Sequence, residues 1–578
     1  MVKQLLKSVR EFKKDALLTP LFVVLEVVME VLIPFVMAEL IDKGIDAQNM
    51  SAIGKYGFIL VACAMLALVF GAAAGTYAAR ASTGFARNLR HDMYYAVQDF
   101  SFSNIDKFST GSIVTRLTTD VTNVQNAFQM CTRIAVRCPV MLIFAFVMAA
   151  KINRNMALIF VAVLPVLAIG LGILMKMVGP VFERVFKIYD RLNTVVQENV
   201  HGIRVVKAYV REDHETEKFE NVSELLYRTF SKAQKTLACN MPLMQFCMYA
   251  CMLLISWFGA RLIVSGSMTT GELTSMFSYI MQILISLMMV AMVFVMITMA
   301  KASAERVEEL LSEKPDLHNP AQPVCEVKDG SIDFDAVDFS YKGDEHKLAL
   351  RDVNLHIYSG QTIGILGGTG SAKSTLVQLI PRLYDVTRGS VKVGGVDVRD
   401  YDIETLRDEV AMVLQKNVLF SGTIKDNLRW GNENASDEEM VEACRLAQAD
   451  DFVRSFPDGY DTYIEQGGTN VSGGQKQRLC IARALLKKPR ILILDDSTSA
   501  VDTRTDALIR EGFRTYIPET TKIIIAQRVA SVQDADLILV MNNGRIADMG
   551  THEELLTSSA IYREVYESQT NGGDGHEA

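Results

Sequence analysis

The stretch TIGILGGTGSAKSTL, residues 362–376, decides the fold of the C-terminal half of this 578-residue chain. It runs from a β-rich segment, TIGIL, through a glycine-rich turn into a helix that we expect to begin at Lys373. In such a turn, backbone N–H groups and the positive end of the helix surround an anionic phosphate chain. The stretch therefore predicts a phosphate-binding loop in an α/β domain. The alternative, a glycine-rich turn without a ligand, fits the strand and helix context less well.

Two residues of this loop have specific expected roles. Lys373 is expected to contact the β- and γ-phosphates of a nucleotide, and the Ser374 hydroxyl is expected to bind Mg²⁺. Ala372 stands where a glycine is usual; it is tolerable if φ is negative there, so binding is expected to be weakened or unaffected and not lost. The residues expected to contact the nucleotide are Gly367, Gly368, Thr369, Gly370, Ser371, Ala372, Lys373, Ser374 and Thr375.

Two further segments support this interpretation. The apolar strand ILILDD (491–496) places Asp495 at its carboxyl end, where it can hold Mg²⁺. Between the two strands lies NVSGGQKQR (470–478), in which Gly473 and Gly474 open a predicted helix whose exposed N–H groups suit another anion. The S-G-G-Q pattern alone is weak, but the order and spacing of the three segments together are specific.

The N-terminal half has a different composition. Hydrophobic residues make up 49% of the chain, and long apolar runs crowd the first 300 residues. A helix needs about 20 residues to cross the hydrocarbon core of a bilayer. Six segments meet or approach this length and predict six membrane spans: 17–41, 57–79, 134–150, 156–178, 241–264 and 273–299.

Basic residues indicate the orientation of these spans. The long connection 180–239 carries ten Lys and Arg residues, whereas the short connections 43–55 and 151–155 carry two each. Positive residues stay on the cytoplasmic side, so the N-terminus, the long connections and the C-terminal half are expected to be cytoplasmic. The first 15 residues are predicted to form an amphipathic helix on the inner membrane surface.

These features predict a division into domains. The membrane domain is expected at 1–312, a proline-containing linker at 313–329, the α/β domain at 330–568 and a disordered tail at 569–578. A net charge of −8 argues against nucleic acid as a partner. The nine cysteines show no C-x-x-C pair and indicate small core residues in a reducing compartment.

With these motifs in this order, the chain resembles a half-transporter of the ATP-binding cassette (ABC) exporters. The resemblance implies the type I exporter fold, an all-α six-helix transmembrane domain followed by an α/β P-loop nucleotide-binding domain, with ATP and Mg²⁺ as cofactors. Tyr341 resembles the residue that stacks on adenine, and Gln415 the glutamine that senses Mg²⁺. The turns at 104–112 and 211–219 resemble the coupling helices of the family. The residues that resemble the signature motif, which contacts the ATP of a partner chain, are Ser472, Gly473, Gly474 and Gln475.

Two catalytic positions depart from the family pattern. Asp496 stands where a glutamate usually polarises the attacking water. The aspartate side chain is one methylene shorter, so its carboxylate falls about 1.5 Å short of the glutamate position. A misplacement near 1 Å can cost about a hundredfold in rate. Gln527 stands where a histidine is usual, and glutamine cannot carry the proton or charge of histidine. A homodimer would then have two poor sites, whereas a partner supplying Glu and His would complete one good site.

This pattern resembles the degenerate subunit of heterodimeric multidrug exporters in Gram-positive bacteria. It implies an ATP-hydrolysing translocase in a bacterial cell membrane, in which this chain pairs with a different half-transporter, contacts membrane lipids and exports hydrophobic or amphipathic small molecules. A homodimeric lipid or peptide exporter, and a nucleotide-gated channel or regulatory subunit, are the alternatives. The six spans exclude a soluble cassette ATPase that acts on nucleic acid.

The substrate path has weaker signals. Glu26 and Glu30 lie four residues apart, on one face of the first span. Carboxylates at membrane depth face a cavity or a partner, so they could attract cationic substrates or pair with a neighbouring helix; the second reading is favoured. Met288 and Met292 belong to a methionine-rich sixth span, and flexible thioethers suit varied apolar ligands but also fill ordinary membrane cores.

Overall fold

The computed structural model describes residues 2–571 and divides into two units. The first comprises the residues up to Gln98 together with Thr110–Glu313, and the second comprises Asp99–Ser109 together with the residues from Lys314 onward. The short segment Asp99–Ser109, which the sequence analysis placed in the membrane domain, therefore groups with the nucleotide-binding part. Each unit is described by itself.

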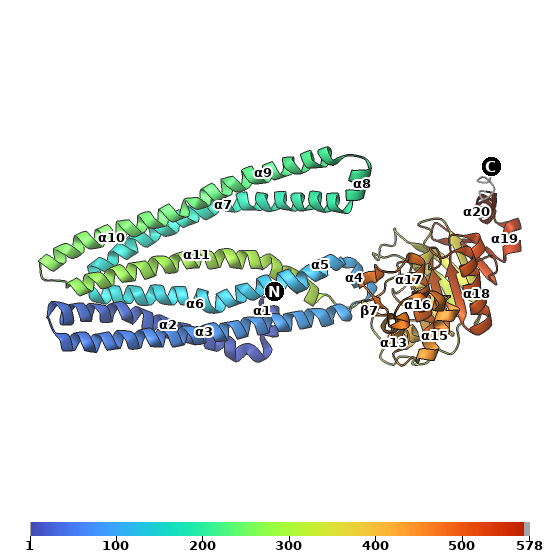
Figure 1. Ribbon diagram of the computed structural model, residues 1–578, viewed down its shortest axis with the longest axis horizontal. Helices are drawn as coiled ribbons and strands as arrows, with labels where there is room; N and C mark the ends of the chain where they lie inside the picture. Colours follow the sequence, from blue (N-terminus) through green and yellow to red (C-terminus); the bar gives the residue numbers. More distant parts are fainter. Residues whose placement is uncertain (1, 572–578) are drawn as a thin grey trace. The chain divides into compact units, whose positions relative to one another are not determined.

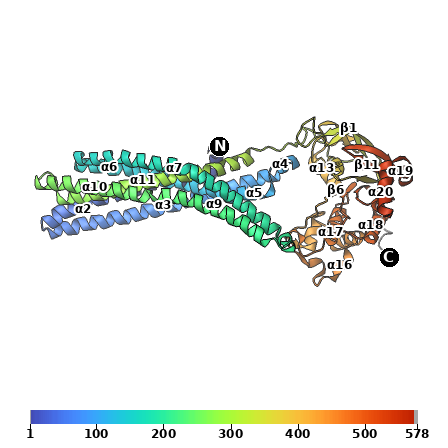
Figure 2. The same cartoon turned by 90° about the horizontal axis from the view of Figure 1, so that it is seen from above.

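The first unit is built from long helices, shown in Figure 1 in colours from blue to green. Six of its helices are long and apolar enough to cross a membrane, which confirms the six predicted spans. Helices α7 and α9 lie side by side in both views (Figures 1 and 2). The helices that contain the spans are α2 (Lys13–Leu40), α3 (Met50–Gln98), α6 (Val121–Ile152), α7 (Arg154–His201), α10 (Asn240–Val264), which follows α9 (Glu212–Ala238), and α11 (Thr270–Ser312).

The N-terminal segment is not one continuous helix. Helix α1 (Val2–Leu5) leads into the 3₁₀ helix η1 (Leu6–Phe12), which is broken at Arg10, where φ is 40° and ψ is −116°. Hydrogen bonds to α3 hold the break in place, because the Ser8 hydroxyl and the Arg10 guanidinium both donate to the Asp92 carboxylate, at 2.7 and 2.6 Å. These hydrogen bonds to α3 explain why the segment is not the single amphipathic helix that its sequence pattern predicted.

The two cytoplasmic reversals of the chain differ in how well they were predicted. The first contains α4 (Phe102–Lys107), α5 (Thr110–Thr115) and the π-helical turn η3 (Arg116–Asp120), near the expected 104–112. The second consists of residues 202–211 with α8 (Ile203–Ala208), so the expected turn at 211–219 is wrong. Those residues begin α9, whose first turn is acidic and therefore favours a helix start.

The second unit contains a six-stranded sheet in the order β12-β11-β3-β10-β9-β6. All neighbouring strands are parallel except β12, which pairs antiparallel with β11. The central strands are buried on both faces, which explains their continuous apolar sequences. The strands are β3 (Thr362–Gly367), β6 (Val410–Val413), β9 (Ile491–Asp495), β10 (Thr521–Ile525), β11 (Leu537–Asn542) and β12 (Arg545–Gly550).

Smaller sheets and helices complete this unit. An antiparallel sheet has the order β2-β1-β4-β5, and β7 pairs with β8. Helix α20 continues to Asn571, so the first three residues of the predicted disordered tail are helical; residues 572–578 lie outside the described residues. The additional strands are β1 (Ile332–Phe339), β2 (Leu350–Ile357), β4 (Arg388–Val393), β5 (Val396–Asp397), β7 (Gly422–Thr423) and β8 (Tyr463–Ile464). Besides α4, the described helices of at least six residues in this unit are α12 (Lys373–Gln378), α13 (Ile403–Glu409), α14 (Ile424–Arg429), α15 (Asp437–Leu446), α16 (Asp450–Ser455), α17 (Gly473–Leu486), α18 (Thr503–Tyr516), α19 (His552–Ser558) and α20 (Ala560–Asn571).

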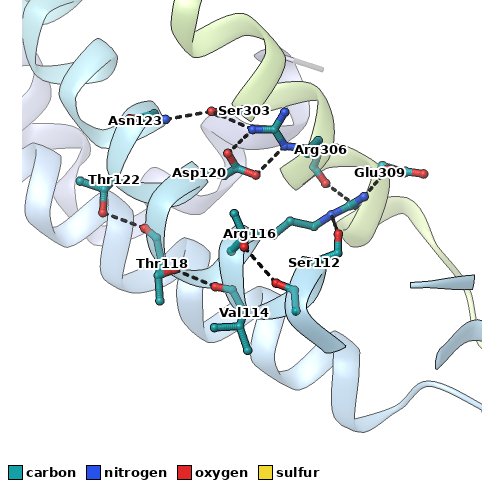
Figure 3. A network of polar contacts seen from close by, with 12 residues as sticks. Ser112, Val114, Arg116, Thr118, Asp120, Thr122, Asn123, Ser303, Arg306 and Glu309 are labelled. Carbon is teal, nitrogen blue, oxygen red and sulfur yellow. Dashed lines mark hydrogen bonds and ion pairs between the residues drawn. The ribbon is translucent and has the colours of Figure 1, made fainter. Parts of the chain in front are cut away.

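A charged network fastens the cytoplasmic end of α6 to α11 (Figure 3). Arg306 of α11 forms a two-pronged ion pair with Asp120, which is fully buried, and its Nε donates to Asp120 Oδ2 at 2.7 Å. One turn earlier, Arg116 donates to the Arg306 carbonyl and to Glu309 Oε2, both at 2.7 Å. Two-pronged pairing suits the planar guanidinium and fixes the register of the two helices.

Removing the arginine from this network tests its contribution. Arg306→Ala leaves the Asp120 carboxylate buried without its ion pair, so we expect a loss of about 2 kcal/mol in the free energy of unfolding, below the range for fully buried pairs because Arg306 is half-exposed. Arg228→Ala, which breaks an exposed pair with Glu224, is the matched control and should change stability by less than about 0.5 kcal/mol. Thermal unfolding of the purified variants measures both, and equal effects would contradict the assignment.

Candidate nucleotide site

The carboxyl ends of four adjacent strands create the candidate site. In the sheet register Ile525 of β10 lies beside Ile365 of β3 and beside Asp495 of β9, and Val413 of β6 lies beside Leu494. The segments that follow these strands therefore leave the sheet at the same edge, which is where ligands bind in parallel α/β sheets. This geometry brings together the phosphate loop, Asp495 at the end of β9 with Asp496 directly after it, Gln415 and Gln527.

The loop after β3 has the form of a phosphate cradle. The Lys373 ammonium donates to the carbonyl oxygens of Gly367 and Gly368, at 2.8 and 2.9 Å. Burial lowers the pKa of Lys373, although Asp495 and Asp496 act in the opposite direction. The Ser371 hydroxyl is buried and has no hydrogen-bond partner among the described residues. A buried donor without an acceptor is costly, and a phosphate oxygen is an acceptor that fits this loop.

Ala372 adopts the conformation that the sequence analysis treated as unfavourable. Its φ is 72° and its ψ is 26°, so it lies in the left-handed region at the N-cap of α12. The condition under which alanine would be tolerated, a negative φ, is therefore not met. Placing a residue with a Cβ in this backbone region destabilises the folded state by about 1–2 kcal/mol. Glycine would avoid this destabilisation. The helix nevertheless begins at Lys373, as predicted.

Oxygen ligands for a magnesium ion lie beside the loop. The Ser374 hydroxyl donates to Asp495 Oδ1 at 3.0 Å, at the end of β9 as the sequence predicted. Burial raises the pKa of Asp495, as does the neighbouring Asp496, while the Ser374 hydrogen bond and Lys373 lower it. No cluster of three or more His, Cys, Asp or Glu side chains suited to a metal occurs among residues 2–571. This donor set fits Mg²⁺ bound by one or two protein oxygens together with phosphate oxygens.

The two residues that depart from the family pattern contact each other. The Gln527 amide donates to Asp496 Oδ2 at 2.7 Å, and the Gln415 amide makes a long hydrogen bond of 3.5 Å to the same oxygen. Asp496 has a φ of 50°, a conformation that aspartate adopts more readily than most residues with a side chain. The structure therefore gathers Gln415, Asp496 and Gln527 around one carboxylate oxygen.

Tyr341 lies in an aromatic cluster next to the phosphate loop. Its hydroxyl shares a 2.9 Å hydrogen bond with Thr375, and 48% of the residue remains exposed, as a stacking surface requires. Its ring meets that of Tyr384 edge-on at 5.2 Å. The Tyr384 hydroxyl donates to Asp106 of α4 at 2.6 Å. Sequence reasoning missed Tyr384 and Asp106, because nothing in their local sequence marks a contact between residues so far apart in the chain.

The predicted signature residues form the start of α17. Ser472 caps this helix by accepting from the Gln475 backbone N–H, and the Gln475 side chain accepts from the Ser472 N–H. A Cβ on Gly474 would lie 2.8 Å from the Ala500 carbonyl oxygen, so only glycine fits there. Gln477 accepts a hydrogen bond from the Ala500 N–H at 3.0 Å and thereby ties the helix to the segment after β9. Ser472 and Gly473 remain exposed.

The candidate substrate-path residues fall into two groups. Arg137 of α6 binds both acidic side chains of α2, with Nη1 2.5 Å from Glu26 and Nη2 2.7 Å from Glu30. This pairing agrees with the favoured interpretation, in which the two glutamates pair with a neighbouring helix. Arg137, which lies within the third predicted span, was the residue in the sequence that could have indicated the partner. Met292 is exposed and Met288 is half-buried. The described methionines of α11 thus occupy different environments, and their role remains a prediction.

A bundle of membrane helices joined to a P-loop domain defines a nucleotide-dependent membrane protein. Comparisons with known proteins agree with this class. The family model described as ABC transporter transmembrane region matches residues 17–306, and the model described as ABC transporter matches residues 350–499. The chain belongs to the ABC transporter family.

Several relatives match over nearly the whole chain. The ABC transporter ATP-binding protein YfiB of Bacillus subtilis (strain 168) is 38% identical over 96% of this chain and 96% of its own length. A putative multidrug export ATP-binding/permease protein of Staphylococcus aureus (strain NCTC 8325 / PS 47) is 31% identical over 98% of this chain and 100% of its own length. The structure of a bacterial Atm1-family ABC exporter with ATP bound matches with a TM-score of 0.80 and 23% identity, covering 97% of this chain and 98% of that chain.

These matches establish the coarse description of the molecule. It has the predicted exporter fold, six membrane-spanning helices followed by an α/β nucleotide-binding domain. It is a multi-pass membrane protein whose nucleotide-binding domain is cytoplasmic. Membership of the family implies ATP hydrolysis coupled to transport.

A glycine at position 372 tests the backbone strain in the phosphate loop. Ala372→Gly removes a Cβ from the left-handed region, so we expect the free energy of unfolding to rise by about 1 kcal/mol. Ala507→Gly, at an exposed site inside α18, is the control of opposite sign and should lower it by about 0.5–1 kcal/mol. Thermal unfolding of the nucleotide-free protein measures both. A loss of stability in both variants would show that position 372 carries no strain.

Proposed function

We propose that this chain is the subunit with the degenerate ATP site in a heterodimeric exporter of amphipathic small molecules. The observation that carries the proposal is the 2.7 Å hydrogen bond between Gln527 and Asp496, formed beside a phosphate loop and a signature helix that keep the features needed for binding. The chain thus retains the residues proposed to bind its own nucleotide and to contact the ATP of a partner. The two groups that would activate water are replaced by Asp496 and Gln527.

ATP and Mg²⁺ fit the residues present. The phosphate loop with Lys373 would hold the phosphate chain, Tyr341 would stack on adenine, and Ser374, Gln415 and Asp495 would hold Mg²⁺. When bound, the nucleotide supplies the phosphoanhydride bond whose hydrolysis drives transport. The chain's own residues position the phosphates and exclude water around Asp495, which is buried.

The Asp496 carboxylate is a poor base for the attacking water. It is one methylene shorter than glutamate, and its Oδ2 already accepts from the amides of Gln527 and Gln415. An oxygen that already accepts from two amides has less capacity left to accept a hydrogen bond from the attacking water. Gln527 donates through an uncharged amide and cannot itself exchange a proton with the reacting groups. Turnover at this site is therefore expected to be slow.

The signature residues support a role for a second, different chain. Ser472 and Gly473 are exposed at the N-terminal end of the 14-residue helix α17, where backbone N–H groups attract anions. In the family arrangement they would complete the ATP site of a partner. A partner with Glu and His at the positions of Asp496 and Gln527 would then have one fully active site opposite this helix.

The substrate class follows from the membrane unit and one relative. The relative from Staphylococcus aureus is described as a putative multidrug export protein, and it matches this chain over its whole length. In the structure Arg137 pairs with both Glu26 and Glu30, and its single positive charge leaves one net negative charge in this group of three side chains. We expect that charge to favour cationic amphipathic ligands, with apolar contacts, including those of the exposed Met292, adding to the affinity.

Unequal effects of two substitutions test the proposal in the natural complex. Gly473→Asp fits this chain, because a Cβ there is 3.6 Å from Ala500 Cβ and an acidic first turn suits α17. It would repel the partner's ATP, so we expect a loss of ATPase activity of about a hundredfold. Lys373→Ala damages only this chain's slow site and should leave at least about half of the activity.

The control is Lys347→Ala, an exposed position in the same domain, which should leave activity unchanged. The subunits of the purified complex are identified by mass spectrometry and its ATPase rate is measured at saturating ATP. Equal or reversed severity of the two variants, or a single polypeptide species with full activity, would contradict the proposal.

A further inference from the structure

An apolar cavity of about 820 Å³ lies among the helices of the membrane unit. Its walls come from the N-terminal segment α1 and η1 and from α2, α3, α6 and α11, with Leu5, Phe85, Phe128 and Ile297 among the lining side chains. Such a volume is within the range of ligand sites for molecules of drug or lipid-tail size. The phosphate site does not include any of these residues.

The cavity lies at the cytoplasmic boundary of the membrane. On α6 its lining runs up to Val136, near the start of the third span, and on α11 it begins at Ile297 and extends beyond the end of the sixth span. The nucleotide-binding domain, which follows α11 in the chain, is cytoplasmic, so this end of the bundle meets the cytoplasmic leaflet. The depth is that of the upper acyl chains and headgroups of this leaflet.

The cavity walls are almost free of polar atoms that could hold water. The two lining hydroxyls, those of Thr132 and Thr298, donate to backbone carbonyls of their own helices, at 3.0 Å to Phe128 and at 2.8 Å to Phe294. Water needs two to four polar partners to occupy a site, and these walls do not supply them. Hydrocarbon is the filling that the walls favour.

One cationic side chain stands among the lining residues. Lys301 is the one Lys or Arg of the described lining, and Asp and Glu are missing from it. The carboxylate of Glu305 is 3.8 Å from its ammonium group, and both side chains are more than half exposed, so this pair is weak. The amine is therefore available to a stronger anion at the rim of an apolar cavity.

We propose that this cavity binds an anionic phospholipid of the cytoplasmic leaflet, with an acyl chain against the apolar walls and the phosphate group on Lys301. The leaflet supplies this ligand at the depth of the cavity, and its charge complements the single cation. Lysine binds phosphate as a point charge, so the interaction does not require the planar geometry of arginine. The site would join the N-terminal segment to α6 and α11 through the lipid chain.

Photolabelling of the intact complex in lipid nanodiscs tests this site. The probe is phosphatidylglycerol with a diazirine at the end of one acyl chain, and the labelled peptides are mapped by mass spectrometry. We expect labelling concentrated in residues 124–136 and 297–304. Ala127→Phe fills the cavity and should reduce this labelling by about fivefold, whereas Ala72→Phe at an exposed position of α3 should leave it unchanged.

A charge variant keeps the test decisive if Ala127→Phe fails to fold. Lys301→Gln should reduce labelling by the anionic probe by about fivefold, the effect of one basic residue at an anionic surface. It should reduce labelling by a matched phosphatidylcholine probe less, because the choline cation of that lipid offsets the charge of its phosphate. Lys7→Gln, an exposed lysine of the N-terminal segment outside the cavity, is the control. Labelling spread evenly over all spans, equal labelling by both probes, or no labelling of the two segments would overturn the proposal.

Discussion

The parallel pairing of β3, β10 and β9 is the constraint on which the nucleotide site depends. Because these strands and β6 end at one edge, residues from distant parts of the chain form hydrogen bonds there: Ser374 with Asp495, and Asp496 with Gln415 and Gln527. Any substitution in this group acts directly on its neighbours, since Asp496 contacts both Gln415 and Gln527. The sheet thus brings into contact the two residues, Asp496 and Gln527, that the resemblance marks as departures from the family pattern.

The sequence predicted the features that are local or periodic. Six apolar runs, the strands that end at Gly367 and Asp495, and the helix starts at Lys373 and Gly473 all form where expected, because each depends on a few neighbouring residues. The φ of Ala372 could not be predicted, since the whole loop sets it. The second cytoplasmic reversal was predicted at 211–219 but lies at 202–211. The acidic residues that were expected in the turn form the first turn of α9 instead.

Pairing of Glu26 and Glu30 with a neighbouring helix was favoured from the sequence, but the identity of the partners in the charge pairs between distant helices was not predicted. Arg137 meets Glu26 and Glu30, and Arg306 meets Asp120, across more than a hundred residues in each case. In both places the arginine pairs with a buried carboxylate, Glu26 or Asp120, and so offsets part of the cost of burying its charge. The membrane unit therefore combines apolar packing with a small number of fixed ionic contacts. In the function proposed here, the changes that slow hydrolysis lie among the residues around Asp496, and the start of α17 keeps its role toward a partner chain.

Repair of the altered centre tests the central claim most directly. In the natural complex, with the catalytic glutamate of the partner changed to glutamine, Asp496→Glu combined with Gln527→His should restore a base of full length and a protonatable neighbour. We predict a rise in ATPase rate of at least about a hundredfold, the lower end of what a positioned base contributes. Ala507→Gly in the same background is the control, because α18 lies outside the centre. An unchanged rate after the double repair would contradict the claim that Asp496 and Gln527 limit this site.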